Sequence, residues 1–133
     1  MSTALRRSAA AVLGRNWRGL YTVPAGGLYP HQWSWDSAFI AIGLCHLSPR
    51  RAQQEIETLL SGQWADGRLP QIIFQTGHDD AYSPGRPFWR SERLPGAPVV
   101  PTAGLIQPPN HAWAALLVHL ADPEESARRS FLE

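Results

Sequence analysis

The sequence predicts an all-α fold built from helical hairpins, the arrangement of an α/α toroid, on the basis of one pattern that occurs twice. Segments 35–47 and 111–120 are apolar on nearly every side, which is typical of buried inner helices. An amphipathic segment follows each of them, at 48–62 and 122–133, and predicts an outer helix. Because the two joints are also alike, each with His-Leu shortly before a proline, we expect two hairpins whose inner helices line a common centre.

The first element is predicted to be an amphipathic helix within residues 1–19. Its apolar side chains fall on one helical face that leads to Trp17, and they are Leu5, Ala9, Val12 and Leu13. The stretch is also rich in arginine and has no acidic residue, as in some organelle-targeting peptides, but helical periodicity already explains these residues. An ordinary first helix is therefore favoured, followed over 19–33 by a loop or short strand pair rich in glycine and proline.

Polar residues and glycines mark the expected helix ends. Ser34 is predicted to cap the first buried helix, and Ser48 to cap the amphipathic helix that ends at Gly62. Asp122 and Glu125 have the spacing of a capping box at the start of the last helix.

The central segment 63–110 is predicted to be a long loop, because it holds most of the prolines and several glycines. It also carries large aromatic side chains, namely Trp64, Tyr82, Phe88 and Trp89. Within it, only LPQIIF at 69–74 predicts a short strand. A loop of this length is usually functional or disordered, and its aromatic content favours a function.

The composition excludes several classes of function. With a net charge of +1 and 17% charged residues, the chain lacks the basic surface of a nucleic-acid-binding protein. All 12 lysine-or-arginine positions are arginine, so no lysine is available for Schiff-base chemistry or for a P-loop. Cys45 is the single cysteine, and no segment approaches the ~20 apolar residues of a membrane span. We therefore expect a soluble, cytoplasmic protein without a nucleic-acid or membrane partner.

A candidate binding site is concentrated in YPHQWSWDSAF, residues 29–39, where aromatic rings surround one carboxylate, Asp36. Rings can cover the apolar C–H faces of a sugar, and a carboxylate accepts hydrogen bonds from its paired hydroxyl groups. Tyr29, Trp33 and Trp35 together with Asp36 therefore suit carbohydrate binding. The residue types alone leave a structural alternative open, because the helix dipole favours an aspartate in the first turn and tryptophans fill cores.

The sequence contains no complete catalytic motif. The five histidines show none of the spacings of metal sites, so no metal or cofactor is expected. Glycoside hydrolysis requires two carboxyl groups, an acid and a base or nucleophile. Glu55 and Glu57 fall on the predicted outer helix and Asp66 in a turn, which leaves Asp36 as the one carboxylate placed for a site. We therefore predict no catalytic residue in this chain.

Four blocks of sequence, in this order, resemble the N-terminal part of a known enzyme family: YPHQWSWDSAFIAIGL, RAQQEIETLLSGQWADGRLPQIIF, YSPGRPFW and TAGLIQPPNHAW. They are similar to the mannosylglycerate and glucosylglycerate hydrolases, a branch of glycoside hydrolase family sixty-three. The resemblance extends from about Tyr29 to Trp113. It implies an (α/α)6 toroid and an inverting glycosidase whose small carbohydrate substrate is a glucosyl or mannosyl unit α-linked to glycerate.

The same resemblance implies roles for individual residues. Tyr29, Trp35 and Asp36 would hold the sugar at the bond to be cut. Tyr82 in a mobile loop would close over the ligand, and Gln107 would donate to the glycerate or to a sugar hydroxyl. Secondary candidates for substrate binding are His31, Trp33 and Trp89. The general acid and general base of the family match no position in this chain.

The chain is expected to be an N-terminal segment, 1–133, of a single (α/α)6 glycoside hydrolase domain that continues past Glu133. Its last helix stops without a cap, and a ring of six hairpins needs on the order of 200 residues or more. Two alternatives stay open: a non-catalytic sugar-binding fragment or pseudoenzyme, and another α/α-toroid glycosidase of the trehalase-like or glycogen-debranching-like type. The sequence predicts no oligomeric state.

Overall fold

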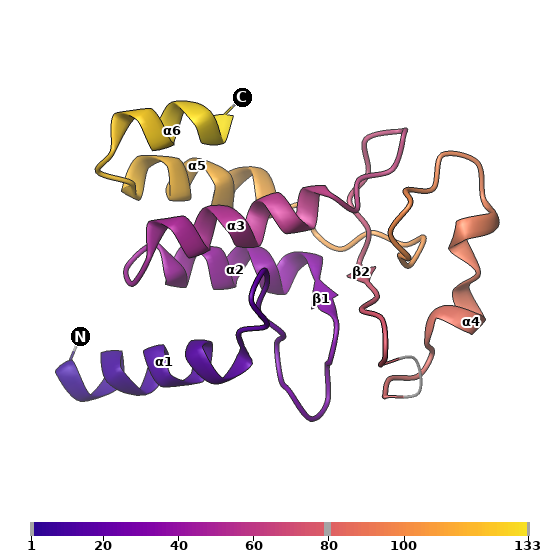
Figure 1. Cartoon of the computed structure of the whole chain (residues 1–133), viewed down its shortest axis with the longest axis horizontal. Helices are drawn as coiled ribbons and strands as arrows, with labels where there is room; N and C mark the ends of the chain where they lie inside the picture. The colour runs from indigo at the N-terminus through magenta and orange to yellow at the C-terminus, as the bar shows by residue number, and fades with distance from the viewer. Residues whose placement is uncertain (1, 79–80, 133) are drawn as a thin grey trace.

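The computed structural model describes residues 2–78 and 81–132, which are mostly helical (Figure 1). The described elements are α1 (Thr3–Asn16), β1 (Gln32–Trp33), α2 (Ser34–Leu44), α3 (Pro49–Leu60), β2 (Ile72–Ile73), α4 (Arg86–Trp89), η1 (Ser91–Arg93), α5 (His111–Ala121) and α6 (Glu125–Leu132). The all-α class predicted from the sequence is confirmed, with a small two-stranded sheet added to it.

Helices α2, α3 and α5 form the core and lie side by side (Figure 1). Many of the buried side chains between them are small, which lets the helices approach closely; the cluster is Ala38, Ala41, Leu44, Ala52, Ile56, Ala114 and Val118. α6 packs on α5, so α2–α3 and α5–α6 are the two predicted hairpins. α1 lies near α2, away from α5, and buries no residue fully, although Leu13 packs against the core.

One side of the helical core is open and apolar. We call it the open side, and its exposed side chains come from α2 and α5: Trp35, Phe39, Trp113, Leu116 and Leu120. Within the described residues, the predicted inner helices 35–47 and 111–120 are therefore buried on one side and exposed on the other. Each helix is covered where its cluster residues, including Leu44 on α2 and Val118 on α5, face the neighbouring helices. An apolar side of this kind is typical of a surface that another element covers.

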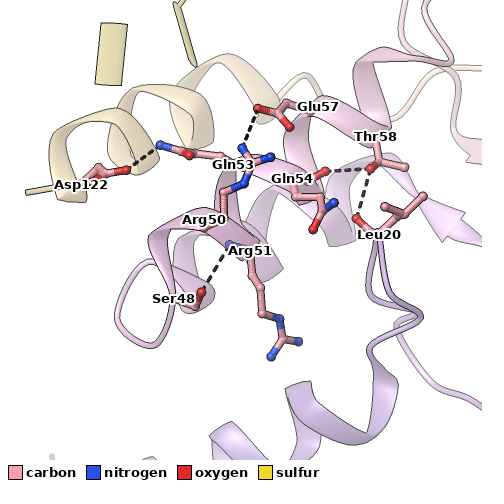
Figure 2. Close-up of polar contacts among 9 residues, drawn as sticks. All are labelled: Leu20, Ser48, Arg50, Arg51, Gln53, Gln54, Glu57, Thr58 and Asp122. Carbon is pink, nitrogen blue, oxygen red and sulfur yellow. Dashed lines mark hydrogen bonds and ion pairs between the residues drawn. The ribbon is translucent and has the colours of Figure 1, made fainter. Parts of the chain in front are cut away.

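Helix α3 begins and ends as the sequence predicts. The Ser48 hydroxyl accepts a hydrogen bond of 3.4 Å from the Arg51 amide, and Pro49 is the first helical residue (Figure 2). The chain then turns at Gly62, where a Cβ atom would lie 2.6 Å from Ile73 Cδ1. A side chain at this position would therefore force the Ile73 side chain to move.

The joint between α5 and α6 differs from the predicted capping box. Asp122 Oδ1 accepts a 2.9 Å hydrogen bond from the Glu124 amide, and Glu125 pairs instead with Arg129 on the surface at 2.6 Å. The other carboxylate oxygen, Oδ2, accepts a 2.7 Å hydrogen bond from Gln53 Nε2 on α3 (Figure 2). Asp122 is buried by this contact, so it ties the joint to α3 and does not form the local box.

Replacing Gln53 by alanine is expected to lower the free energy of unfolding by about 1–3 kcal/mol, because the buried Asp122 carboxylate then loses a donor. Chemical denaturation followed by circular dichroism measures the change. Arg50→Ala on the same helix is the matched control, since its ion pair with Glu57 is exposed and 3.6 Å long. That variant should change stability by under about 0.5 kcal/mol, and equal losses in both variants would contradict the prediction.

The small sheet holds the segment before α2 in an extended conformation. β1 pairs with β2 in the antiparallel sense, with Gln32 opposite Ile73 and Trp33 opposite Ile72. The sequence predicts a strand over 69–74, and β2 confirms it for two of these residues. The strand pair therefore connects the start of α2 to the central segment.

Contacts between its own side chains hold parts of the central segment 63–110 together. Trp64 is buried, and its Nε1 donates to Thr102 Oγ1 at 3.1 Å. The Arg68 guanidinium carbon lies 4.1 Å from the centre of the Trp64 ring. The segment also contains α4 and η1, two short helical turns within the predicted loop. Four or three residues are too few to show a helical period in the sequence.

Candidate functional site

A cavity of about 360 Å³ lies where β1 and α2 meet two loops. Its lining comes from separate parts of the chain and consists of Pro24, Ala25, Tyr29, Trp33, Asp36 and Gln107. Tyr29, Trp33, Asp36 and Gln107 are candidates named from the sequence. Pro24 and Ala25 are not predicted, because neither carries a group that a sequence pattern could connect with a ligand.

Asp36 lies in the first turn of α2 and provides the one carboxylate that lines this cavity among residues 2–78 and 81–132. Partial burial raises the pKa of its carboxyl group above the ordinary value, while a hydrogen bond with its own backbone amide acts in the opposite direction. The group is thus half-buried and still open to the cavity. In this environment ligand hydroxyls can replace the water that hydrates the carboxylate.

The first turn of α2 is capped by a distant residue, Gln107. Its Oε1 accepts a 3.0 Å hydrogen bond from the Trp35 amide, which satisfies one of the free amides at the helix start. The prediction that Ser34 is the cap is wrong: α2 begins at Ser34, whose own amide donates to the Gln71 carbonyl at 3.0 Å. Because the Gln107 oxygen is used on the helix, its amide nitrogen is the part that can donate to a ligand.

Three aromatic rings form a wall beside the cavity. Tyr29 and Trp33 meet edge to face with their ring centres 5.2 Å apart, and Tyr82 meets Trp33 in the same way at 5.0 Å. Trp33 is buried, whereas Tyr29 is 43% exposed and offers its ring to a ligand. The central segment therefore brings Tyr82 to the wall, where it supports the two rings that line the cavity.

His31 and Trp89 lie behind this wall. His31 is fully buried, its ring stacks on Trp33 at 5.7 Å, and its Nδ1 accepts a 3.2 Å hydrogen bond from the Gln75 amide. Trp89 packs against the buried cluster that contains Trp33, and its Nε1 donates to the Pro84 carbonyl at 3.0 Å. Both residues therefore support Trp33 and are not part of the cavity lining as the structure describes it.

The ring of Trp35 belongs to the open side. Its ring centre lies 5.8 Å from that of Phe39, and the ring centre of Phe39 lies 6.4 Å from that of Trp113. The contribution of Trp35 to the cavity is its backbone amide, which holds Gln107. The structure thus brings Trp35 to the site through the backbone and not through its ring.

Glu55 is not among the site candidates predicted from the sequence, which places it only on the outer helix. In the structure Glu55 is fully buried and accepts a 2.6 Å hydrogen bond from the Ser37 hydroxyl. A signal was present, because Glu55 shares one helical face with Ala52, Ile56 and Leu59 and is the charged member of that apolar stripe.

The cavity offers a carboxylate acceptor, an amide donor and aromatic surface. This set suits a ligand that has several hydroxyl groups and apolar C–H faces. Within the described parts of the chain, no group of three or more His, Cys, Asp and Glu side chains is arranged to hold a metal ion. In the same parts, no helix has the length and apolar character needed to cross a membrane.

Comparison with known proteins gives matches along most of the chain. The model of the mannosylglycerate hydrolase MGH1-like glycoside hydrolase domain matches residues 29–133. A mannosylglycerate hydrolase of Rubrobacter radiotolerans is 46% identical over 126 residues, which are 94% of this chain and 28% of that protein. A glucosylglycerate hydrolase of Mycolicibacterium hassiacum is 45% identical over 132 residues, which cover 95% of this chain and 29% of that protein.

A solved structure matches as well. The GH63 mannosylglycerate hydrolase from Thermus thermophilus, crystallised with Tris and D-glycerate, is similar with a TM-score of 0.83 and 43% identity, over 96% of this chain and 29% of that one. The chain therefore spans less than a third of the length of these relatives. The resemblance found in the four sequence blocks is confirmed, and the chain belongs to the family of MGH1-like mannosylglycerate hydrolases within the glycoside hydrolases.

Proposed function

We propose that this chain forms the sugar-binding wall of an inverting glycosidase that cleaves a glucosyl or mannosyl unit α-linked to glycerate. The observation that carries the proposal is the cavity in which Tyr29, Asp36 and Gln107 converge. The names of the relatives, and the D-glycerate bound in one of them, support this substrate class. The chain would then be the N-terminal part of one (α/α)6 domain, whose other hairpins cover the open side.

Each lining side chain has a role in this proposal. The Asp36 carboxylate accepts hydrogen bonds from two sugar hydroxyls, and the exposed Tyr29 ring covers a C–H face. Gln107 donates from its amide nitrogen to the glycerate or to a hydroxyl group. Because the Trp35 amide already fixes the Gln107 oxygen, the donor is oriented before the ligand arrives, which reduces the entropy lost on binding.

The catalytic pair is proposed to lie outside this chain. An inverting glycosidase needs two carboxyl groups about 6.5–9.5 Å apart with a water molecule between them. Of the described carboxylates, Asp36 alone lines the cavity. The chain therefore contributes binding and orientation, and the acid and base come from elsewhere in the protein. The same observation favours a second candidate, sugar binding without hydrolysis, which applies if no such pair is present.

Replacing Gln107 by alanine in the full-length protein that carries this chain tests the proposal. The KM for glucosylglycerate and mannosylglycerate is expected to rise about tenfold, because the ligand loses an uncharged donor and α2 loses its cap. Gln63→Ala is the matched control, since Gln63 is exposed and donates only to the Gly67 carbonyl at 2.8 Å. An unchanged KM in Gln107→Ala would contradict the proposed role, and binding of both substrates without turnover in the wild type would favour the second candidate.

The proposed compartment is the cytoplasm. Cys45 is a free and partly buried thiol, and burial raises its pKa, which lowers its reactivity. A single unpaired cysteine is typical of proteins from reducing compartments.

A further inference from the structure

A buried polar cluster lies behind the cavity, where β1, α2 and α3 meet. Its members are Gln32, Ser37 and Glu55, none of which is exposed to solvent. The Ser37 hydroxyl donates to Glu55 Oε1 at 2.6 Å, and Gln32 Nε2 donates to the same oxygen at 3.3 Å. Gln32 Nε2 also lies 3.1 Å from the Glu55 carbonyl oxygen and 3.0 Å from the Ser37 hydroxyl oxygen. One residue of α3 thus holds side chains from both neighbouring elements.

Two partners of Glu55, Gln32 and Ser37, are each next in the sequence to a residue that lines the cavity. Gln32 precedes Trp33 in β1, and neighbouring residues of a strand point to opposite sides. Ser37 follows Asp36 in α2, where successive side chains are about 100° apart around the axis. One side of the corner between β1 and α2 is therefore fastened to α3, while the other side carries Trp33 and Asp36 to the cavity.

Glu55 is deeply buried, so ionisation of its carboxyl group is expected to change how firmly the corner between β1 and α2 is held. Burial raises the pKa of Glu55 from 4.5 to about 7, and the contacts with Ser37, Thr22 and Gln32 lower it by less than burial raises it. Because the pKa is raised, the stability that the neutral carboxyl provides is complete below about pH 4.5 and is lost as the pH rises through 7. Tyr21 is the titratable neighbour that interacts with the charge of Glu55, and burial raises its pKa above 10.0, so it stays neutral in this range.

We propose that Glu55 is a positioning residue for the cavity. It acts through Gln32 and Ser37, by fixing the corner between β1 and α2. When Glu55 ionises, the carboxylate favours arrangements in which water reaches it, so the corner loosens and the ligand is bound more weakly. The inference rests on the proposed sugar-binding function. It means that α3, which the sequence pattern predicts as an outer helix, helps to position the residues that bind the sugar.

The first test measures D-glucose affinity at pH 6 and pH 8 in the full-length protein that carries this chain. Wild type is expected to bind at least threefold more weakly at pH 8. Glu55→Gln keeps an acceptor oxygen for Ser37 but cannot ionise. This variant should therefore bind D-glucose with the same affinity at pH 6 and pH 8. Glu57→Gln, an exposed position on the same helix (Figure 2), should keep the pH dependence of wild type. The wild-type pH dependence in Glu55→Gln would overturn the proposal.

The second test does not depend on sugar binding. In protein labelled with ¹⁵N-tryptophan, the Trp33 indole N–H resonance, assigned with Trp33→Phe, is followed against pH. We expect an inflection near pH 7 in wild type, set by the pKa of Glu55 of about 7, that Glu55→Gln lacks. His31 stacks on Trp33 and is present in both proteins, so the difference between the two pH curves reports on Glu55. An inflection that persists unchanged in Glu55→Gln would overturn the positioning role whether or not glucose binds.

A second variant keeps the inference testable if Glu55→Gln does not fold. Ser37→Ala removes a hydrogen bond that lowers the pKa of Glu55, so the inflection should move to higher pH. An inflection that does not move would count against the proposal. If no variant binds D-glucose while the Trp33 inflection still depends on Glu55, the sugar-binding function fails and the positioning role stands.

Discussion

The 133-residue chain by itself is expected to hydrolyse neither glucosylglycerate nor mannosylglycerate. Inversion needs an acid and a base on opposite faces of the bond, and Asp36 is the one carboxylate that the described residues bring to the cavity. Glu55 does not supply the second group, because it is buried against Ser37 on the far side of the corner. Enzymatic detection of released glycerate measures the turnover, with the full-length protein as the positive comparison.

The Asp36→Asn variant of the isolated chain distinguishes turnover by the chain from turnover by a contaminating enzyme. Turnover that is equal in the chain and in this variant comes from another enzyme in the preparation. Turnover by the chain that Asp36→Asn abolishes would contradict the prediction, because it would mean that the catalytic pair is completed within these 133 residues.

In the full-length protein, Asp36→Asn is expected to lower kcat/KM for glucosylglycerate at least tenfold, which corresponds to about 1.4 kcal/mol. Asparagine keeps the shape of the side chain, but its neutral carbonyl oxygen accepts hydrogen bonds from hydroxyl groups less strongly than a carboxylate does. Burial raises the pKa of Asp36, so lowering the pH should weaken wild-type activity before an ordinary aspartate would be protonated.

Asp66→Asn is the control for this prediction. Asp66 is an exposed aspartate whose partner, Arg68 Nε, lies 3.1 Å away on the surface of the central segment. Its replacement should leave kcat/KM unchanged, since exposed ion pairs contribute little. A loss of less than tenfold in Asp36→Asn, or an equal loss in Asp66→Asn, would show that the Asp36 carboxylate does not hold the sugar.

The longer helices, α1, α2, α3, α5 and α6, and their order could be predicted because local sequence patterns encode them. Ser48 and Pro49 specify the start of α3 through contacts within a few residues, and the apolar period specifies which side of the helix is covered. The candidates Tyr29, Asp36 and Gln107 could be named as well, from residue types and from the family resemblance. That they line one cavity is a finding of the structure.

Other features of the site depend on contacts that no local pattern contains. Ser34 has the right residue type for a cap, yet the cap comes from Gln107. Ser34 is already the first residue of α2, and its amide donates to the Gln71 carbonyl. The rings of Trp33 and Trp35 lie on different sides of the chain, and the direction in which β1 enters α2 decides which of them reaches the cavity. The burial of Glu55, in contrast, could be predicted from the sequence. An acidic residue inside an apolar stripe requires polar partners in the core.

The hydrogen bond between Gln107 and the start of α2 also has a consequence for the order of folding. Gln107 and its partner Trp35 are 72 positions apart, so the bond forms only when two distant parts of the chain have come together. The entropy lost in closing so long a loop comes before the gain from the contact. Contacts of the α2–α3 hairpin, such as those around Ala41 and Ile56, should therefore be present in the transition state, with Gln107 joining after it. The recognition surface around Asp36 is then the last part of the chain to become native, and the first to be lost in partial unfolding.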